Sequence, residues 1–304
     1  MSAAASAQAG HVGGAPRQLP GRVILVGAGP GSIDLLTLKA ARLIAAADWL
    51  VHDALVQPEV VALATRAQII CVGKRAGRQS TRQHDINRTL IDCAARGGLV
   101  VRLKGGDPLL FARAQEELDA LREAGIAVEV VPGITTAQAA YAALAAPMTE
   151  RGKRRSVVFA TPQIKTGPRP ARGWASPAGA GSDSGSKPAD DDEHPSAQPD
   201  PLDVQWARAL VNAGGGALYM ASTVASRTRA TLLSLGMPAD TPATWIVNVS
   251  LPDQSVLATT LGELKALPDG LAGQPALLLL GTAVPSPWHE PRAIREPATA
   301  TISS

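Results

Sequence analysis

The chain has 304 residues, of which 45% are hydrophobic, 18% are charged and 3% are aromatic, and its formal net charge is +3. This composition supports substantial folded cores, and the two cysteines exclude both a disulfide framework and a cysteine-rich zinc site. The few aromatic side chains argue against stacking on nucleic-acid bases, and no apolar run approaches the roughly 20 residues that cross a bilayer. We therefore expect a soluble, cytoplasmic protein of two domains, with no nucleic-acid or membrane partner and no metal site.

Three segments show no hydrophobic periodicity, and we predict that they are disordered. They are residues 1–20, which lack the basic start and apolar core of a secretory signal, an insertion at 167–203, and a tail at 286–304. The insertion holds three basic and seven acidic side chains, a net charge of −4, which leaves +7 on the rest of the chain. A moderately basic body of this kind favours an anionic ligand.

The first part of the chain alternates short apolar runs with helical patterns. Runs typical of strands and the turns after them lie at 22–29, 48–56, 68–74, 99–108 and 128–133, and helical patterns lie at 35–47, 59–67, 84–97, 116–125 and 135–146. Strand, helix and strand in steady succession indicate βαβ units and a mainly parallel sheet. We predict an N-terminal α/β domain over 21–152.

The second part has fewer helical patterns and more visible alternation within its strands. Strands are predicted within 154–162, 214–222, 241–250, 254–264 and 275–284, and a helix over 226–237. Alternation such as WIVNVS and SVLATT is typical of antiparallel strands with one solvated face. We predict a C-terminal α/β domain over 153–285 with a mixed sheet, and a ligand cleft between the two domains.

A glycine turn, VGAGPGS, joins the first strand to the first helical pattern. The dinucleotide-binding fingerprint is the obvious comparison, but its third glycine position falls on Ser32, and Pro30 removes one backbone N–H from any phosphate site. These two residues disfavour a pyrophosphate ligand. An ordinary tight turn is an equally good interpretation.

Two further turns follow predicted strands of the same sheet. Because the carboxyl ends of parallel strands lie at one edge, all three turns are expected to form one rim, with Asp107 able to accept hydrogen bonds from a ligand. Ordinary caps remain an alternative, with Asp107 capping a helix before Pro108 and a threonine opening the next helix. The residues at issue in these turns are Gly105, Gly106, Asp107, Thr135 and Thr136.

Asp53 and Lys74 also follow predicted strands, so both are expected at this rim. Opposite charges there can supply a proton acceptor and a proton donor. A surface ion pair is the simpler alternative.

Taken together and in order, these motifs resemble the uroporphyrinogen-III C-methyltransferase family and, more broadly, the tetrapyrrole methyltransferases that use S-adenosylmethionine. The matching segments include VGAGPGSIDLLTLKA, VHDALV, VGKRAGRQSTRQHDIN, VVRLKGGDPLLF, EVVPGITTAQAA, ALYMAST and LPDQSVLATTLGEL, and they cover nearly all of 22–281 apart from the insertion. The resemblance implies two α/β domains, a homodimer, and methylation of uroporphyrinogen III at C2 and C7 to give precorrin-2 for sirohaem or cobalamin synthesis.

The same resemblance implies roles for individual residues. It makes Asp53 the proton acceptor and Lys74 the proton donor. Because uroporphyrinogen III carries eight carboxylates, we further hypothesise that arginines hold them, with Arg75, Arg78, Arg82, Arg102 and Arg113 as candidates. The resemblance also places around S-adenosylmethionine the residues Pro30, Gly105, Gly106, Asp107, Leu110, Thr135, Thr136, Met220 and Val249.

The sequence departs from the family pattern at three places. Residues 112–117 read ARAQEE where the family often has GRGGEE, which favours a helix over a flexible loop. Val249 stands where a glycine that contacts the cofactor is expected, and valine does not adopt positive φ cheaply. The insertion follows Thr161-Pro162-Gln163, near the usual site of a loop over the substrate.

Three rival functions remain open. One is methylation of a later precorrin, although the stretch GKRAGRQSTRQHDIN is more similar to enzymes acting on uroporphyrinogen III itself. The second is a NAD-dependent precorrin-2 dehydrogenase, suggested by the first glycine turn. The third is a non-catalytic module whose acidic run at 190–193 recruits a partner.

Overall fold

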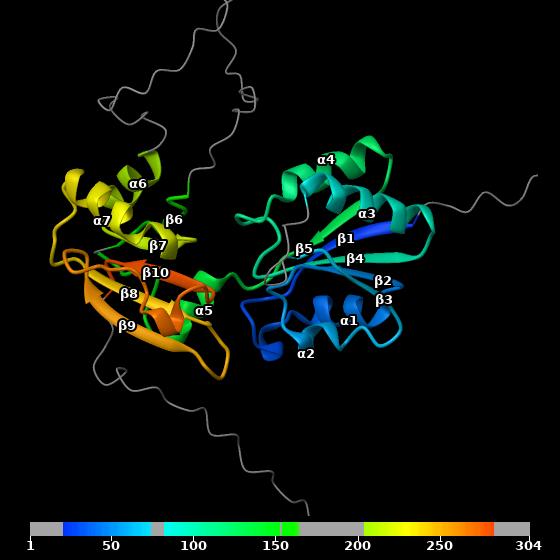
Figure 1. The fold of residues 1–304 in the computed structure, drawn as a ribbon, viewed down its shortest axis with the longest axis horizontal. Helices are drawn as coiled ribbons and strands as arrows, with labels where there is room; N and C mark the ends of the chain where they lie inside the picture. The colour runs from blue at the N-terminus through cyan, green and yellow to red at the C-terminus, as the bar shows by residue number, and fades with distance from the viewer. Residues whose placement is uncertain (1–20, 74–81, 153, 164–203, 283–304) are drawn as a thin grey trace, which may run out of the picture. The chain divides into compact units, whose positions relative to one another are not determined.

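The computed structural model describes residues 21–73, 82–152, 154–163 and 204–282. They fold into two compact units that divide between Ala139 and Ala140 (Figure 1). The domain limits 21–152 and 153–285 stay predictions, and the segments 1–20, 167–203 and 286–304 lie outside the described residues.

The first unit contains one parallel sheet in the order β3-β2-β4-β1-β5. Its strands are β1 (Arg22–Gly27), β2 (Trp49–His52), β3 (Gln68–Cys71), β4 (Leu99–Lys104) and β5 (Val128–Val131). Its helices are α1 (Leu38–Ala46), α2 (Pro58–Val61), α3 (Gln83–Ala95) and α4 (Ala114–Glu123), with a short 3₁₀ helix, η1 (Ile33–Leu35). Helix α5 (Thr136–Ala143) crosses the division between the units. The predicted parallel α/β sheet is confirmed.

Alternation along the central strand β1 builds two cores, one on each face of this sheet. Ile24 and Val26 pack with residues of α1 and α2, whereas Val23 and Leu25 pack with residues of α3 and α4. Side chains of a strand alternate between the faces, so the unbroken apolar run over residues 23–26 is what a sheet covered on both sides requires. Figure 1 shows α1 and α2 on one side of the sheet and α3 and α4 on the other.

The second unit contains a mixed sheet in the order β6-β7-β10-β8-β9, in which only the β6–β7 pair is parallel. A single core joins this sheet to α6 and α7. The mixed sheet is therefore confirmed as well. The elements are β6 (Phe159–Ala160), α6 (Gln205–Ala213), β7 (Gly216–Tyr219), η2 (Ser222–Val224), α7 (Ala225–Ser234), β8 (Pro242–Val247), β9 (Ser255–Thr260), η3 (Asp269–Leu271) and β10 (Ala276–Leu280).

Three predicted elements differ from the observed ones. The helix expected over 59–67 is only the four-residue α2, where the β-branched pair Val60 and Val61 favours helix poorly. The strand expected over 154–162 shrinks to β6. Helix α6 was not predicted, because it starts directly after the insertion and no side chain caps its N-terminus, although it buries Ala207 and Leu210 on one face.

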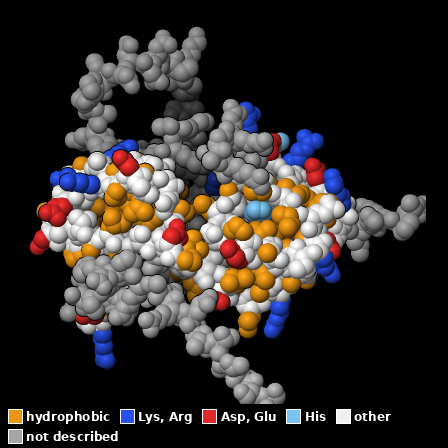
Figure 2. All heavy atoms as spheres, turned by 60° about the horizontal axis from the view of Figure 1, so that its bottom comes forward, with side chains coloured by type: hydrophobic (Ala, Val, Ile, Leu, Met, Phe, Trp, Pro, Cys, Tyr) orange, Lys and Arg blue, Asp and Glu red, His pale blue; other side chains and the backbone are white. Residues whose placement is uncertain are grey.

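The surface carries no single basic patch on the face that Figure 2 displays. There the Lys and Arg side chains of the described residues stand apart from one another, with acidic side chains and patches of hydrophobic ones between them. Within the described residues, no helix is long and apolar enough to cross a membrane.

Candidate functional site

Two of the glycine turns meet at the carboxyl ends of the neighbouring strands β1 and β4. The N–H of Ala28 donates to the carbonyl of Lys104 (2.7 Å), and the N–H of Gly106 donates to the carbonyl of Gly29 (2.7 Å). Gly29 and Gly106 have φ of 72° and 65°, a left-handed conformation that glycine adopts without steric cost. The backbone of the two turns is thus continuous across the sheet edge.

The third turn, at Gly133, is braced against the other two by Asp107. One oxygen of this carboxylate accepts from the N–H of Gly133 (3.1 Å) and the other from the N–H of Leu109 (2.9 Å). A Cβ added at Gly27 would lie 2.5 Å from the backbone nitrogen of Gly133, so the turns pack too closely for any side chain there. The predicted rim of three turns is confirmed, and Asp107 cross-links it instead of capping a helix.

Gly105 differs from the other glycines of this rim because it is exposed. A Cβ added there would meet only the side chain of Leu55, at 3.9 Å. The residue is exposed, whereas its neighbours Lys104 and Gly106 are buried. A ligand can therefore approach the backbone closely at Gly105, which is the use of glycine that the sequence suggested.

The remaining predicted cofactor residues of this unit lie in the same turns. Pro30 follows the Gly29–Gly106 bridge, and the N–H of Leu110 donates to the carbonyl of Asp107 (3.4 Å). Thr135 stands at the start of α5, where its N–H donates to the side chain of Gln138 (3.2 Å) and its carbonyl accepts from the helix. The capping interpretation of Thr135 thus fits the geometry, and Thr136 is the first residue of the helix.

The first glycine turn differs from a dinucleotide-binding turn in the element that comes after it. This element is the 3₁₀ helix Ile33–Leu35, and α1 begins only at Leu38, after its own cap at Thr37. In the dinucleotide fold the glycine turn opens directly onto the helix whose N-terminus receives the pyrophosphate. The turn in this chain has a different geometry.

Asp53 lies at the end of β2 and is held by a buried arginine of β4. Arg102 donates from Nη2 to Oδ1 of Asp53 (2.7 Å); the Arg102 side chain is 1% exposed and that of Asp53 is 32% exposed. Within the described part of the chain, Oδ2 of Asp53 accepts no hydrogen bond. One oxygen of this carboxylate is therefore anchored, and the residue still reaches solvent.

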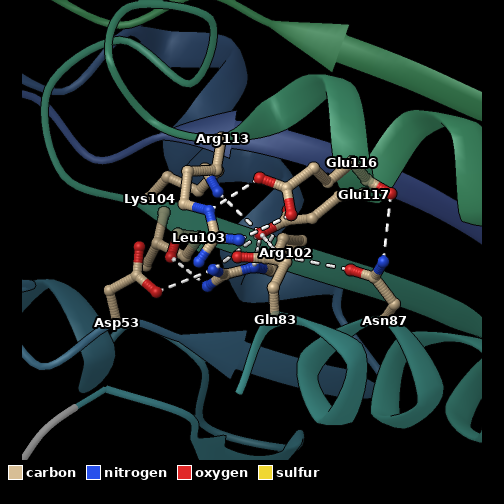
Figure 3. Close-up of polar contacts among 9 residues, drawn as sticks. All are labelled: Asp53, Gln83, Asn87, Arg102, Leu103, Lys104, Arg113, Glu116 and Glu117. Atoms are coloured by element: carbon tan, nitrogen blue, oxygen red, sulfur yellow. Dashed lines mark hydrogen bonds and ion pairs between the residues drawn. The ribbon is translucent and has the colours of Figure 1, made fainter. Parts of the chain in front are cut away.

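The partner of Arg102 on its other side is Glu117 of α4 (Figure 3). Glu117 is fully buried and accepts from Arg102 (Nη2 to Oε1, 3.1 Å), from Lys104 (Nζ to Oε1, 2.7 Å) and from Gln83 (Nε2 to Oε1, 3.2 Å). Arg102 and Lys104 project from the same face of β4, because they are two residues apart. With Asp53, two cations and two anions thus form a balanced and largely buried cluster.

The charges in this cluster set the protonation of its members. Burial alone would raise the pKa of Glu117, but the adjacent Arg102 and Lys104 outweigh it and hold this pKa below its ordinary value. Burial, followed by the charge of Arg102, lowers the pKa of Lys104. For Arg102, burial would lower the pKa, but the pull of Asp53 and Glu117 outweighs it and raises the pKa. Glu117 and Arg102 are therefore both charged at neutral pH.

Sequence reasoning missed Glu117, although a signal was present. Ala114, Glu117 and Leu121 are the buried positions of α4, and their spacing of three and four residues puts all three on one helix face. A lone carboxylate on an apolar helix face requires a buried cation opposite it.

The arginines predicted to hold substrate carboxylates differ in burial and in the partners they contact. Arg102 cannot do so as placed, because it is buried and pairs with Asp53 and Glu117, so this prediction is wrong. Arg113 is partly exposed and pairs with Glu116 (Nε to Oε1, 2.7 Å), and Arg82 is exposed at the start of α3. Arg75, Arg78 and the predicted proton donor Lys74 lie outside the described residues.

The loop before α4 is not the helix that residues 112–117 favour. Phe111 and Arg113 have φ of 52° and 54°, and the helix begins only at Ala114. The helical expectation is therefore wrong for Ala112 and Arg113. Two left-handed residues fold the chain back after Asp107, and the Arg113–Glu116 ion pair spans the start of the helix.

In the second unit, Met220 and Val249 follow strands β7 and β8. Met220 is 45% exposed and has φ of 56°. Val249 is buried, and the positive φ values fall on its neighbours Asn248 (51°) and Ser250 (69°). The chain thus turns at this position without forcing the β-branched residue into the left-handed region. Asn tolerates that region better than most residues.

Two side chains brace the Val249 turn. The amide of Asn248 donates to Asp253 (2.6 Å) and to Gln274 (2.7 Å). The N–H of Ser250 donates to the side chain of Gln254 (2.8 Å). Within the described residues, no group of three or more His, Cys, Asp or Glu side chains is arranged to hold a metal ion.

The sequence of this chain is similar to those of siroheme synthases. The chain is 38% identical over 270 residues to siroheme synthase 1 of Klebsiella pneumoniae subsp. pneumoniae and 39% identical over 267 residues to siroheme synthase of Zymomonas mobilis subsp. mobilis. Each match covers 88% of this chain, but only 50% and 49% of the relative, so the chain spans about half the length of these relatives.

A solved structure matches at nearly full length. It is uroporphyrin-III C-methyl transferase from Thermus thermophilus complexed with S-adenyl homocysteine, with 30% identity and a TM-score of 0.64 over 86% of this chain and 97% of that one. The model of the tetrapyrrole (corrin/porphyrin) methylase family matches residues 22–265. The chain therefore belongs to the tetrapyrrole (corrin/porphyrin) methylases.

Proposed function

We propose that this chain transfers methyl groups from S-adenosylmethionine to C2 and C7 of uroporphyrinogen III, giving precorrin-2 for sirohaem or cobalamin synthesis. The observation that supports this most strongly is the meeting of three glycine turns at one sheet edge, with Asp53 at the end of a neighbouring strand. The Thermus thermophilus relative, named uroporphyrin-III C-methyl transferase and crystallised with S-adenyl homocysteine, supports the choice of both ligands.

The rim fits the cofactor in two respects. Gly105 offers bare backbone that a nucleoside can approach, and Asp107 can still accept hydrogen bonds, since each carboxylate oxygen has a second lone pair. When bound, S-adenosylmethionine supplies a methyl group on a positively charged sulfur. We assign to its site Pro30, Gly105, Gly106, Asp107, Leu110, Thr135, Thr136, Met220 and Val249.

Methyl transfer to a ring carbon adds one positive charge to the macrocycle, and the loss of a proton removes it. We assign this proton to Asp53, because one oxygen is anchored on Arg102 while the carboxylate reaches solvent. The proton donor in this proposal is Lys74. The substrate brings eight carboxylates, for which the exposed arginines Arg82 and Arg113 are the described candidates.

The test is anaerobic incubation of the purified chain with uroporphyrinogen III and methyl-labelled S-adenosylmethionine. We expect two labelled methyl groups per macrocycle, counted by mass spectrometry. Label on a later precorrin but not on uroporphyrinogen III would reassign the substrate. A shift in NAD absorbance on titration, without methyl transfer, would favour the dehydrogenase.

Asp53→Asn tests the role of the carboxylate directly. The amide oxygen can still accept from Arg102 but cannot take up a proton, so we expect turnover to fall at least about 100-fold with binding of S-adenosylhomocysteine retained. Turnover and calorimetric affinity, measured on the same preparation, check this. Undiminished methylation would remove Asp53 from the mechanism.

A homodimer and a cytoplasmic location complete the proposal. Light scattering coupled to gel filtration measures the first, and cell fractionation the second. For the insertion at 167–203, deletion followed by the methylation assay separates a partner-binding role from catalysis.

A further inference from the structure

We propose that Glu117 is a positioning residue for Asp53, and that it acts through Arg102. This inference rests on the proposed function, because it takes Asp53 as the proton acceptor.

Arg102 is the sole hydrogen-bond partner of the Asp53 carboxylate among the described residues. Its Nη2 reaches Oδ1 of Asp53 at 2.7 Å from a side chain that is almost fully buried. The position of the partly exposed carboxylate therefore depends on where the guanidinium lies.

Glu117 in turn fixes that guanidinium. Its two oxygens accept from Nη2 (3.1 Å) and Nε (3.3 Å) of Arg102, which is the paired geometry that defines a guanidinium plane. Within the described residues, the one further partner of Arg102 is the carbonyl of Leu103, which accepts from Nη1 (3.3 Å). Without Glu117, the arginine would keep this long contact and its pairing with Asp53.

Glu117 itself is held firmly. Lys104 and Gln83 also donate to its Oε1, and Gln83 in turn donates to Asn87 (3.2 Å), whose amide donates to the carbonyl of Glu116 (3.0 Å) (Figure 3). Donors from helix α3 and from strand β4 thus hold the carboxylate that α4 carries. A chain of fixed contacts leads from this core to the proton acceptor.

Glu117→Asp is the variant that tests this arrangement. It keeps the charge of the cluster but shortens the side chain by one methylene, so that it cannot hold Arg102 in the same place. We expect kcat to fall about 10- to 100-fold, the cost typical of misplacing a reacting group by about 1 Å. The KM for uroporphyrinogen III and the affinity for S-adenosylhomocysteine should stay within about twofold. Glu123→Asp, at an exposed position of the same helix, is the matched control and should behave as wild type.

A double-mutant cycle separates positioning from a general structural role. If Glu117 acts through Asp53, then Glu117→Asp should change the residual kcat of Asp53→Asn by less than about twofold. A structural role would instead lower kcat by the same factor in both backgrounds, which would overturn the proposal. Thermal unfolding of each variant shows whether the fold is retained.

A second variant serves if Glu117→Asp does not fold. Glu117→Gln combined with Lys104→Gln removes one anion and one cation together, with Lys104→Gln alone as its reference. A lower kcat than the reference, at unchanged S-adenosylhomocysteine affinity, supports the proposal, and an equal kcat overturns it. A wild-type chain that transfers no methyl group refutes the proposed function itself, whereas an active wild type with an unimpaired Glu117→Asp refutes only the role of Glu117.

Discussion

The glycine turns at the rim of the first unit and the turns at Met220 and Val249 of the second unit reach left-handed backbone by different means. At the rim of the parallel sheet, the residues with positive φ are the glycines Gly29 and Gly106. In the mixed-sheet unit, Met220, Asn248 and Ser250 adopt the same region with side chains attached. For non-glycine residues this conformation costs about 1–2 kcal/mol each.

This contrast shows how these two sets of turns obtain their geometry. The rim needs no support from side chains other than Asp107, because its glycines adopt the required φ freely and pack backbone against backbone. The turn around Val249 instead depends on hydrogen bonds from Asn248 and to Gln254. We expect the rim to be destabilised by any side chain added where its glycines pack closely. We expect the Val249 turn to be destabilised by substitutions that remove its hydrogen bonds.

Gly27→Ala should have the strongest effect of the variants at these turns. Its Cβ would lie 2.5 Å from the backbone nitrogen of Gly133. Because the backbone at neither residue can move away easily, we expect a loss of at least about 2 kcal/mol in unfolding free energy. Urea denaturation measures it. Gly270→Ala, where a Cβ would meet nothing within 4 Å, is the control. An unchanged midpoint for Gly27→Ala would mean that the turns are not in such close contact.

Gly105→Ala separates packing from binding at the same rim. The added Cβ meets only Leu55 at 3.9 Å, so we expect stability to stay within about 0.5 kcal/mol of wild type. A ligand lying on this backbone would be displaced, and affinity for S-adenosylhomocysteine should fall about tenfold, which is about 1.4 kcal/mol. Calorimetry gives the affinity, and full affinity would place the cofactor elsewhere.

The buried charges of the first unit predict a dependence of its stability on pH. The pKa of Glu117 lies below its ordinary value of 4.5, so its ionised form stabilises the fold above that value, and this stabilisation is lost as the pH falls through the lower, folded-state pKa. The difference in unfolding free energy between wild type and Glu117→Gln should be constant from about pH 5.5 to 7 and shrink below about pH 4.5. Urea titrations across this range test it; a difference that grows towards low pH contradicts it.

Met220→Gly should change stability in the opposite direction to Gly27→Ala, and by a smaller amount. Glycine removes the strain of the left-handed backbone at this position in the folded state, but it also increases the conformational entropy of the unfolded chain. Because the first effect is slightly larger, we expect a gain of up to about 1 kcal/mol in stability. If Met220 contacts the cofactor, the same variant should bind S-adenosylhomocysteine more weakly. A loss of stability instead would show that the exposed side chain makes contacts worth more than the strain.

The sequence allowed the sheet classes and the rim to be predicted because both follow from local rules. Apolar strands that end in glycine turns point to parallel strands with their carboxyl ends together, and Gly29, Gly106 and Gly133 do lie together. Such a prediction needs only the order of the elements and the direction of the strands.

The errors concern contacts between residues far apart in the chain. The sequence makes Arg102 a candidate for binding substrate carboxylates, but its ion pair with Glu117 of α4 is buried, and this contact between distant residues is visible only in the structure. Ala112 and Arg113 favour a helix by propensity, but the loop after Asp107 has left-handed backbone at Phe111 and Arg113, and the helix begins only at Ala114. Helix α6 has a regular apolar face but no capping side chain, so its start was not recognisable.

The balanced charge of the cluster also constrains how this protein can diverge. Arg102, Lys104 and Glu117 are shielded from bulk water, and Asp53 completes their neutrality, so replacing one ion alone strands its counterpart in a low-dielectric interior. A lysine lost from β4 should therefore be tolerated only alongside a second change on α4 or in this cluster. During evolution, substitutions at these four positions should therefore occur in pairs, whereas residues on the surrounding surface can be replaced one at a time.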